Sequence, residues 1–525
     1  MQSNRQSSHV FSQVPKAEIP RSSFDRSHGH KTAFDAGYLI PVLVDEALPG
    51  DTFNCRLTGF ARMATPIFPV MDNLFMDTHF FAVPLRLLWT NWQKFCGEQT
   101  NPGDSTSFVL PIMTAHIPAV SSLSDYMGLP TAGQATNAYE HVSLFHRAYN
   151  LIYNQWFRDE NMQNSVVVDV DNGPDAIADY VLLQRGKRHD YFTSALPWPQ
   201  KGTAVSMPLG TTAPVTSYGS NIVLTSPTDS NKTMTVGAGG TPLYLFGAGG
   251  VGGAITFGPP GTTTTGLQAD LTNATAATIN QLRQSFQVQR LLERDARGGT
   301  RYTEILKAHF GVTSPDARLQ RPEYLGGGST QINVSQVPQT SSTDATTPQG
   351  NLSAFATATL HNNGFTKSFT EHCIIIGLVS VRADLNYQQG LQRMFKRSTR
   401  YDFFWPALAH IGEQTILQGE IYKLGTAADD TVFGYQERYA EYRYKPSMTT
   451  GLLRSTAAAT LDAWHVAQKF TAAPTLNGTF IVENPAVDRV VAVPTQPHFI
   501  FDSYISMKCA RPMSVYGVPG FIDHF

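Results

Sequence analysis

The chain has few charged residues and few cysteines for its length. Only 15% of its 525 residues are Asp, Glu, Lys or Arg, and the formal net charge is -2. This balance excludes a protein whose whole surface is basic enough to grip nucleic acid, although it leaves room for local basic patches. The four cysteines form no CxxC pair and no metal-ligand spacing, so we expect small buried side chains in a reducing compartment, with no metal and no cofactor.

Long apolar runs are also missing. The longest, residues 373–379, is far too short to span a bilayer, and no basic-then-apolar leader opens the chain. We therefore expect a protein that is made in a cytoplasm and does not insert into a membrane.

Charge almost disappears between residues 203 and 280. This segment has only Lys232, Asp229 and Asp270, but it contains 13 Gly and 17 Thr. It lacks both the large apolar faces of a core and the high charge of a solvated tail. The composition predicts a neutral excursion of turns and short strands, presented on a globular body.

Alternating apolar and polar residues predict strands near both ends of the chain. Residues 52–64 place Phe53, Cys55 and Leu57 on one face and Arg56 and Thr58 on the other. Residues 499–509 alternate in the same way. Residues 74–83 are apolar on both faces, and residues 373–384 begin so and end alternating.

Three segments have helical patterns. Residues 84–97 begin with Pro and end with Gly, and residues 140–159 carry a stripe of large apolar side chains at spacings of three and four. A third helix is expected over residues 278–296, ended by Gly298 and Gly299. Residues 326–352, rich in Thr, Gln, Ser and Gly, are expected to be a linker.

The order of these elements predicts a mainly β, antiparallel architecture. Residues 1–50 are expected to form an extended, mildly basic arm, and residues 51–525 one domain assembled from both chain ends. No sustained βαβ alternation appears, so a doubly wound parallel sheet is excluded. Scattered strands with long connections favour a sandwich or a jelly roll, with the helices in insertions.

Motifs for catalysis fail in their context. The GxGxxG spacing at residues 247–252 is followed by AITFGPP (254–260) instead of the helix that a dinucleotide site requires. His28 and His30 lack further ligands for a metal. Glu437 and Glu441 stand beside arginines, which favours ion pairs over an acid–base pair. We expect no enzyme.

One local cluster combines cations with aromatic rings. Residues 393–405 (RMFKRSTRYDFFW) suit single-stranded nucleic acid, because cations neutralise phosphates and rings stack on unpaired bases. Arg and large aromatics are also enriched at protein interfaces, and both interpretations stay open. The candidate DNA-binding residues are Arg393, Lys396, Arg397, Arg400, Tyr401 and Phe404.

Six blocks of the sequence closely resemble the major capsid proteins of the Microviridae, the small icosahedral phages with single-stranded DNA, and within them the gokushovirus branch. The blocks are VPKAEIPRSSFD (14–25), MDNLFMDTHFFAVPLR (71–86), LPWP (196–199), ERDARGGTRY (293–302), GYQERYAEYRYKP (434–446) and YGVPGFIDHF (516–525).

This resemblance implies an eight-stranded viral jelly roll, sixty copies of which form a T=1 shell around circular single-stranded DNA. It implies a virion protein that assembles in the bacterial cytoplasm with a small basic DNA-binding protein, an internal scaffolding protein and a minor pilot protein. The neutral segment, taken as residues 203–277, falls where the family carries an insertion that forms protrusions at the three-fold axes.

We expect the insertion to contact a bacterial surface receptor, with Tyr218, Tyr244, Phe246 and Phe257 as candidate contacts. The family supplies no catalytic residues and no short motif that fixes DNA contacts. Two rivals remain: a nucleotide-fold enzyme, which lacks its helix here, and a phage fibre or lectin-like carbohydrate-binding β-sandwich.

Overall fold

The computed structural model describes residues 20–205, 279–299, 302–312, 320–341 and 348–516. It also describes residues 343 and 345 and the short strands at 215–217, 224–225, 256–257 and 267–269. The chain divides into two compact units. One combines Met1–Pro199 with Thr313–Phe525, and the other is Gln200–Val312.

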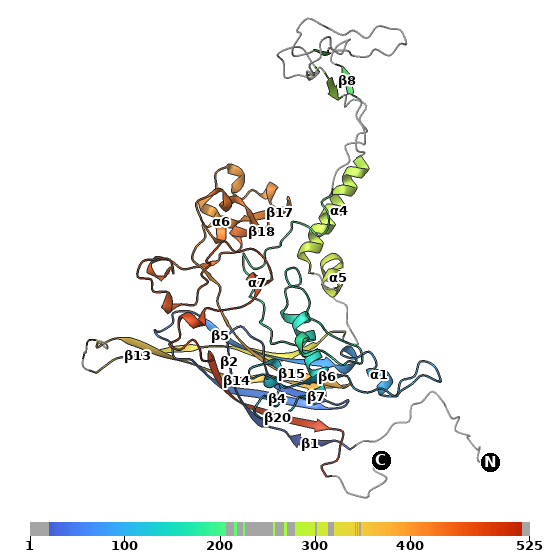
Figure 1. Ribbon diagram of the computed structural model, residues 1–525. Helices are drawn as coiled ribbons and strands as arrows, with labels where there is room; N and C mark the ends of the chain where they lie inside the picture. Colours follow the sequence, from blue (N-terminus) through green and yellow to red (C-terminus); the bar gives the residue numbers. More distant parts are fainter. Residues whose placement is uncertain are drawn as a thin grey trace, which may run out of the picture. The chain divides into compact units, whose positions relative to one another are not determined.

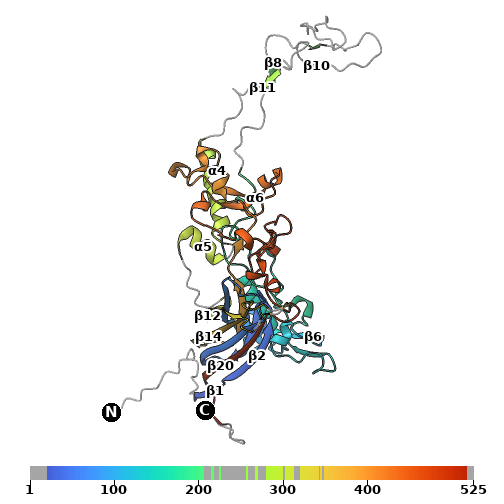
Figure 2. The ribbon, with the colours of Figure 1, turned by 90° about the vertical axis from the view of Figure 1, so that its left-hand side faces the viewer.

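The larger sheet of the first unit has six strands, three from the N-terminal part of the chain, one from the C-terminal part, and β13 and β14 from between them. Its order is β1-β20-β4-β14-β13, with β2 also paired to β20. Figure 2 shows β1, β2 and β20 side by side at one edge. The bounds are β1 Ser22–Asp25, β2 His28–Phe34, β4 Thr52–Met63, β13 Asn333–Pro338, β14 Leu352–Ser368 and β20 Phe499–Arg511.

The smaller sheet has four strands in the order β12-β5-β15-β3. They are β3 Ile40–Ala47, β5 Leu74–Pro84, β12 Glu323–Gln331 and β15 Cys373–Ala383. Every strand pair in the two large sheets is antiparallel. The expected mainly β, antiparallel architecture is therefore confirmed (Figure 1). Strands from the two ends of the chain lie side by side, because β20 pairs with β4 along the whole length of β4.

The main core lies between these two sheets. Phe53, Cys55 and Leu57 of β4 and Phe501 of β20 pack into one cluster with Ile375 of β15, and all are fully buried. The alternation of residues 52–63 explains this placement, because every second side chain of a strand points to the same face.

A second core covers the outer face of the smaller sheet. Helix α3 (Leu144–Ile152) packs there against β5 and β15, with Tyr149 and Ile152 buried against Ile374 and Ile376. The same layer includes α1 Trp92–Phe95, α2 Leu123–Tyr126, and the hairpin of β6 Ile112–His116 and β7 Tyr139–Val142. Strand β15 is buried at every position because it has a core on each side.

A third core supports the region between β15 and β20. It is built around Phe192, Tyr387, Ile421 and Phe433. The elements here are β16 Asn386–Tyr387, which pairs in parallel with β19 Ser447–Met448, the hairpin β17 Glu413–Leu417 with β18 Val432–Glu437, α6 Gln418–Ile421 and α7 Gly478–Ile481.

The second unit contains the predicted third helix. Helix α4 spans Ile279–Arg297, followed by Gly298 and by Gly299 with φ +93°, and then α5 spans Tyr302–Phe310. Its short strands pair as β8 (Val215–Ser217) with β11 (Leu267–Ala269), and β9 (Leu224–Thr225) with β10 (Thr256–Phe257).

Two helix predictions are wrong in extent. Residues 84–97 form a 3-10 turn, η1 (Leu85–Leu87), and the four-residue α1, because the chain turns to bury Trp89 and bond its indole to Asn172. Residues 139–142 form β7, so α3 begins only at Leu144 and continues into a π-helical turn, η2 (Tyr153–Phe157).

The expected linker at residues 326–352 is wrong for about half of its length. Residues 323–331 form β12 and residues 333–338 form β13. The glycines of β12 are required by close packing, since a Cβ on Gly327 would lie 2.0 Å from the Thr78 carbonyl oxygen.

Residues 1–50, expected as an extended arm, contain β1, β2 and β3 within their described part, and Phe34 enters the main core. Residues 1–19 lie outside the described residues. The cysteines Cys55, Cys373 and Cys509 are buried and Cys96 is exposed, with no disulfide among them. Within the described ranges, no helix is both long and apolar enough to cross a membrane.

Candidate functional site

The predicted cluster at residues 393–405 lies in the third core region, on a series of tight turns. They are the 3-10 turns η4 Arg393–Phe395, η5 Arg400–Asp402 and η6 Pro406–Leu408. The Asp402 side chain accepts hydrogen bonds from the amides of Ser398 and Thr399, which fixes the second turn. Pro at the start of the third turn suits its fixed φ.

Three of the four cations in this cluster already have carboxylate partners. Arg393 Nη1 lies 2.8 Å from Glu420 Oε1, and Arg397 Nη2 lies 3.5 Å from Glu441 Oε1. Lys396 pairs with Asp430. These pairs reduce the positive charge that the cluster can offer to phosphates.

Arg400 is the exception. Its guanidinium lies over two rings, 5.1 Å from the centroid of Tyr401 and 5.7 Å from that of Trp405. Within the described part of the chain, no carboxylate lies within ion-pair distance of it. The Trp405 indole donates to the Arg400 carbonyl at 2.8 Å, so ring and cation are held together.

The aromatic side chains of the cluster are half exposed. Phe404 packs edge-on against Tyr439 with ring centroids 5.3 Å apart, and Arg397 lies 4.4 Å from the Tyr442 centroid. About half of each of the side chains of Tyr401, Phe403, Phe404 and Trp405 remains accessible. The structure thus brings all six predicted residues, Arg393, Lys396, Arg397, Arg400, Tyr401 and Phe404, into one neighbourhood.

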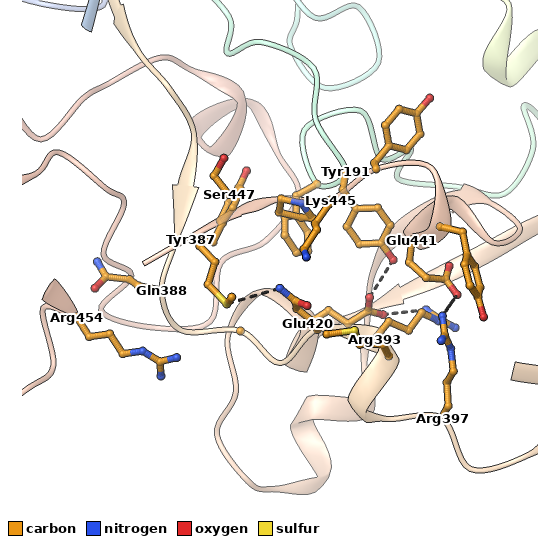
Figure 3. A pocket seen from close by; sticks show the side chains of 18 residues that line it. Tyr191, Tyr387, Gln388, Arg393, Arg397, Glu420, Glu441, Lys445, Ser447 and Arg454 are labelled. Atoms are coloured by element: carbon orange, nitrogen blue, oxygen red, sulfur yellow. Dashed lines mark hydrogen bonds and ion pairs between the residues drawn. The ribbon is translucent and has the colours of Figure 1, made fainter. Parts of the chain in front are cut away.

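A cavity of about 210 Å³ opens beside the cluster (Figure 3). Its lining includes Tyr191, Tyr387, Arg393, Glu420 and Arg454. Burial raises the pKa of Glu420 despite the neighbouring Arg393, and the Tyr191 hydroxyl donates to Glu420 Oε2 at 2.9 Å. Burial, with Glu420 nearby, raises the pKa of Tyr191 well above its usual range. The charged groups bind one another, as in a structural ion network.

Sequence reasoning missed the carboxylates that neutralise the cluster. Glu420 lies in α6, 27 residues after Arg393 in the chain, and no short sequence spacing relates the two residues. The Glu437–Glu441 prediction is confirmed in its main point, because Glu437 pairs with Arg443 and Glu441 with Arg397.

The predicted receptor contacts fall mostly beyond the described residues. Tyr218, Tyr244 and Phe246 lie outside them, as does the GxGxxG spacing at 247–252. Phe257 lies in β10, with its backbone paired to Leu224. His28 and His30 lie on β2, and no group of three or more His, Cys, Asp and Glu among the described residues is arranged to hold a metal.

Two antiparallel sheets around one core, with an aromatic, ion-paired surface region, define a β-rich, antiparallel protein. A family model described as capsid protein (F protein) matches residues 12–521. The chain is 48% identical to capsid protein VP1 of Bdellovibrio phage phiMH2K, with 99% of each chain covered. It is 43% identical to capsid protein VP1 of Chlamydia phage 1, with 97% of each covered.

Capsid protein VP1 of Spiroplasma virus 4 is 36% identical over 98% of this chain and 97% of its own. The chain therefore belongs to the capsid protein (F protein) family. The resemblance to the capsid proteins of the gokushovirus branch of the Microviridae is confirmed. As a capsid protein, it is a component of the virion.

Proposed function

We propose that this chain is the major capsid protein of a small single-stranded-DNA phage, and that sixty copies form a T=1 icosahedral shell around circular DNA. The observation that supports this most is the similarity to capsid protein VP1 of phage phiMH2K over 99% of both chains. The role is structural and not enzymatic.

We propose further that the two sheets are an eight-stranded viral jelly roll. The support is the pairing of four strands, β2, β20, β4 and β14, on one side of the core and of β12, β5, β15 and β3 on the other. In this proposal the helices and the third core region are insertions between jelly-roll strands.

The direct test is expression of the chain with its co-encoded partner proteins, followed by electron microscopy and nuclease digestion. Closed spheres that protect circular single-stranded DNA are expected. Small oligomers that bind glycans and enclose no nucleic acid would instead favour the alternative, a fibre or lectin-like β-sandwich. We propose that assembly takes place in the bacterial cytoplasm. The proposed partners are a small basic DNA-binding protein, an internal scaffolding protein and a minor pilot protein.

Residues 203–277 are proposed to form the three-fold protrusion that contacts a bacterial surface receptor, through Tyr218, Tyr244, Phe246 and Phe257. Neutral loops from three subunits can meet without repulsion, and close association protects exposed strand edges. Joining Gly202 to Asn280 by a short Gly/Ser bridge should leave shells intact and abolish attachment to cells.

A milder variant keeps the length and replaces those four aromatics by Ala. It should retain assembly and weaken attachment. If the deletion stopped assembly while the subunit stayed folded, the loop would be a shell-building element and the receptor role would be lost.

For the cluster at residues 393–405, we propose a subunit junction, with DNA contact as the competing role. The ion pairs of Arg393, Lys396 and Arg397 support the junction, because these cations are already neutralised. Replacing Arg397 and Arg400 by Ala should impair assembly at unchanged DNA content per particle. Intact assembly with less DNA would favour the DNA role instead.

A further inference from the structure

Among the residues that the structure describes, none forms a layer over the outer surface of the six-stranded sheet. The outward side chains of β1, β2, β20, β4 and β14, here called the bare face, alternate with the buried ones along each strand. Large apolar residues stand on it: Phe60 is 50% exposed, Tyr504 55% and Ile500 64%. A sheet face of this kind marks a binding surface.

The register brings these residues together. Tyr504 lies opposite Thr58, and Asp502 opposite Phe60, so Tyr504 and Phe60 are diagonal neighbours on adjacent strands. Such neighbours lie within reach of aromatic side chains. On the same strand as Phe60, Arg56 and Arg62 point outward on either side of it. The result is a patch of rings flanked by guanidinium groups.

The cations of this patch are available. In the described part of the chain no carboxylate lies within ion-pair distance of Arg56 or Arg62. The bare face carries four cations and two carboxylates: Arg56, Arg62, Lys31, Lys508, Asp25 and Asp502. Asp502 lies 3.7 Å from Lys31, which offsets its charge. The bare face therefore has a surplus of positive charge. In the cluster at residues 393–405, by contrast, three of the four cations are paired with carboxylates.

We propose that the bare face binds single-stranded DNA, with Phe60 and Tyr504 stacking on bases and Arg56 and Arg62 contacting phosphates. This rests on the proposed function and names the surface of the subunit that meets the genome. Unpaired bases offer their faces to exposed rings, whereas paired bases do not, so a single strand fits better than a duplex. A second copy of the same face fits poorly, because its surplus positive charge would face itself.

The test uses the full-length subunit and a thirty-residue oligothymidine, with binding followed by fluorescence anisotropy over a range of salt. Arg56→Gln with Arg62→Gln should lower the slope of log affinity against log salt by about 1.4, or about 0.7 for each lost phosphate contact. Phe60→Ala with Tyr504→Ala should weaken binding on the order of tenfold or more at every salt concentration, with the slope unchanged.

Matched controls lie elsewhere on the subunit. Lys423→Gln removes one positive charge, at a lysine that is already paired with Asp429, and Tyr516→Ala removes a ring that is 82% exposed. Both should bind like the original chain. Circular dichroism and thermal unfolding should be unchanged in the bare-face variants and in Tyr516→Ala, because the replaced side chains are exposed and unpaired with buried charges. A thirty-base-pair duplex should bind more weakly than the single strand.

Particles provide the second measurement. Those assembled from the Arg56/Arg62 or Phe60/Tyr504 variants should contain less nuclease-protected DNA. Unchanged affinity and slope in both variants would overturn the inference. So would variants that fail to assemble while binding the oligonucleotide normally, since the bare face would then be a contact between subunits. If the original chain bound the oligonucleotide through this face but formed no shells, the proposed function would fail and the inference would stand.

Discussion

The two sheets of the sandwich share one core and differ in what lies on their outer faces. Outside the four-stranded sheet, α3 and its neighbours bury Ile374, Ile376 and Leu378 of β15. Outside the six-stranded sheet, the equivalent positions of β4 and β20 are exposed and carry Phe60, Tyr504 and arginines. A strand that is apolar on both faces therefore indicates a structural layer above it. A strand with exposed rings and cations indicates a partner.

The same contrast holds for charged groups. Asp77 on the outer face of the four-stranded sheet is buried and contacts Arg382 at 2.8 Å and Arg185 at 2.7 Å. Burial alone would raise its pKa, but the Ser329 hydrogen bond and the two guanidinium groups together hold the pKa of Asp77 below its usual value. Asp502 and Lys31 on the bare face are exposed and farther apart.

The largest effect is expected from Asp77→Ala. It removes the carboxylate shared by two largely buried arginines, of which Arg382 keeps only a 3.7 Å contact with the partly exposed Asp384, and it should lower the free energy of unfolding by about 3–5 kcal/mol. The matched change Asp502→Ala should alter it by less than about 0.5 kcal/mol, because exposed pairs contribute little. Chemical denaturation of the subunit measures both. Equal effects would mean that the bare face is covered within the subunit.

A second pair compares isoleucines on the two outer faces. Ile376→Ala on β15 removes a fully buried side chain and should cost about 2–5 kcal/mol of unfolding free energy. Ile500→Ala on β20 removes one that is 64% exposed and should have almost no effect on unfolding. A large loss from Ile500→Ala, measured by the same denaturation, would contradict the assignment of this face as uncovered.

A smaller effect is expected from pH on the covering layer. Burial, with His141 and His116 nearby, lowers the pKa of His146 to about 3, and burial, with His116 nearby, lowers that of His141 to about 4. Below pH 6.5 these histidines are protonated in the unfolded chain but stay neutral in the folded chain. The free energy of unfolding is therefore highest above pH 6.5 and falls as the pH drops towards 4.

His146→Gln should make this decline shallower, because Gln cannot be protonated and can still bond Ser124. Melting temperatures between pH 4 and 7 measure the slope. His361→Gln, which replaces an exposed histidine of β14, is the control and should follow the original chain. If His146→Gln had the original slope, the buried histidine would not be its source.

The strands that build the comparison could be predicted from the sequence. The period of two in residues 52–63 and 499–511 is strong because one face is buried and the other exposed. The apolar run of β15 was equally clear. The interaction of the two chain ends followed from the same patterns, since isolated half-buried strands need a partner.

Other elements depended on contacts that are distant in the sequence. The glycines of β12 resemble a linker, yet they let the strand lie against Thr78 and Asn363. Residues 84–97 have a helical pattern, but they form only two short turns because the chain turns to bury Trp89. At the candidate site, composition located the cations and rings but could not supply Glu420 or Glu441, whose positions are set by tertiary packing.

The central claim is that the outer face of the four-stranded sheet is buried within the subunit, whereas the bare face binds the single-stranded DNA genome. Ultraviolet crosslinking of DNA-filled particles, followed by mass spectrometry of the peptides joined to nucleotides, tests it most directly. The account predicts crosslinks at Phe60 on β4 and Tyr504 on β20, and none on β15. Efficient crosslinking elsewhere on the subunit, with none on β4 or β20, would contradict it.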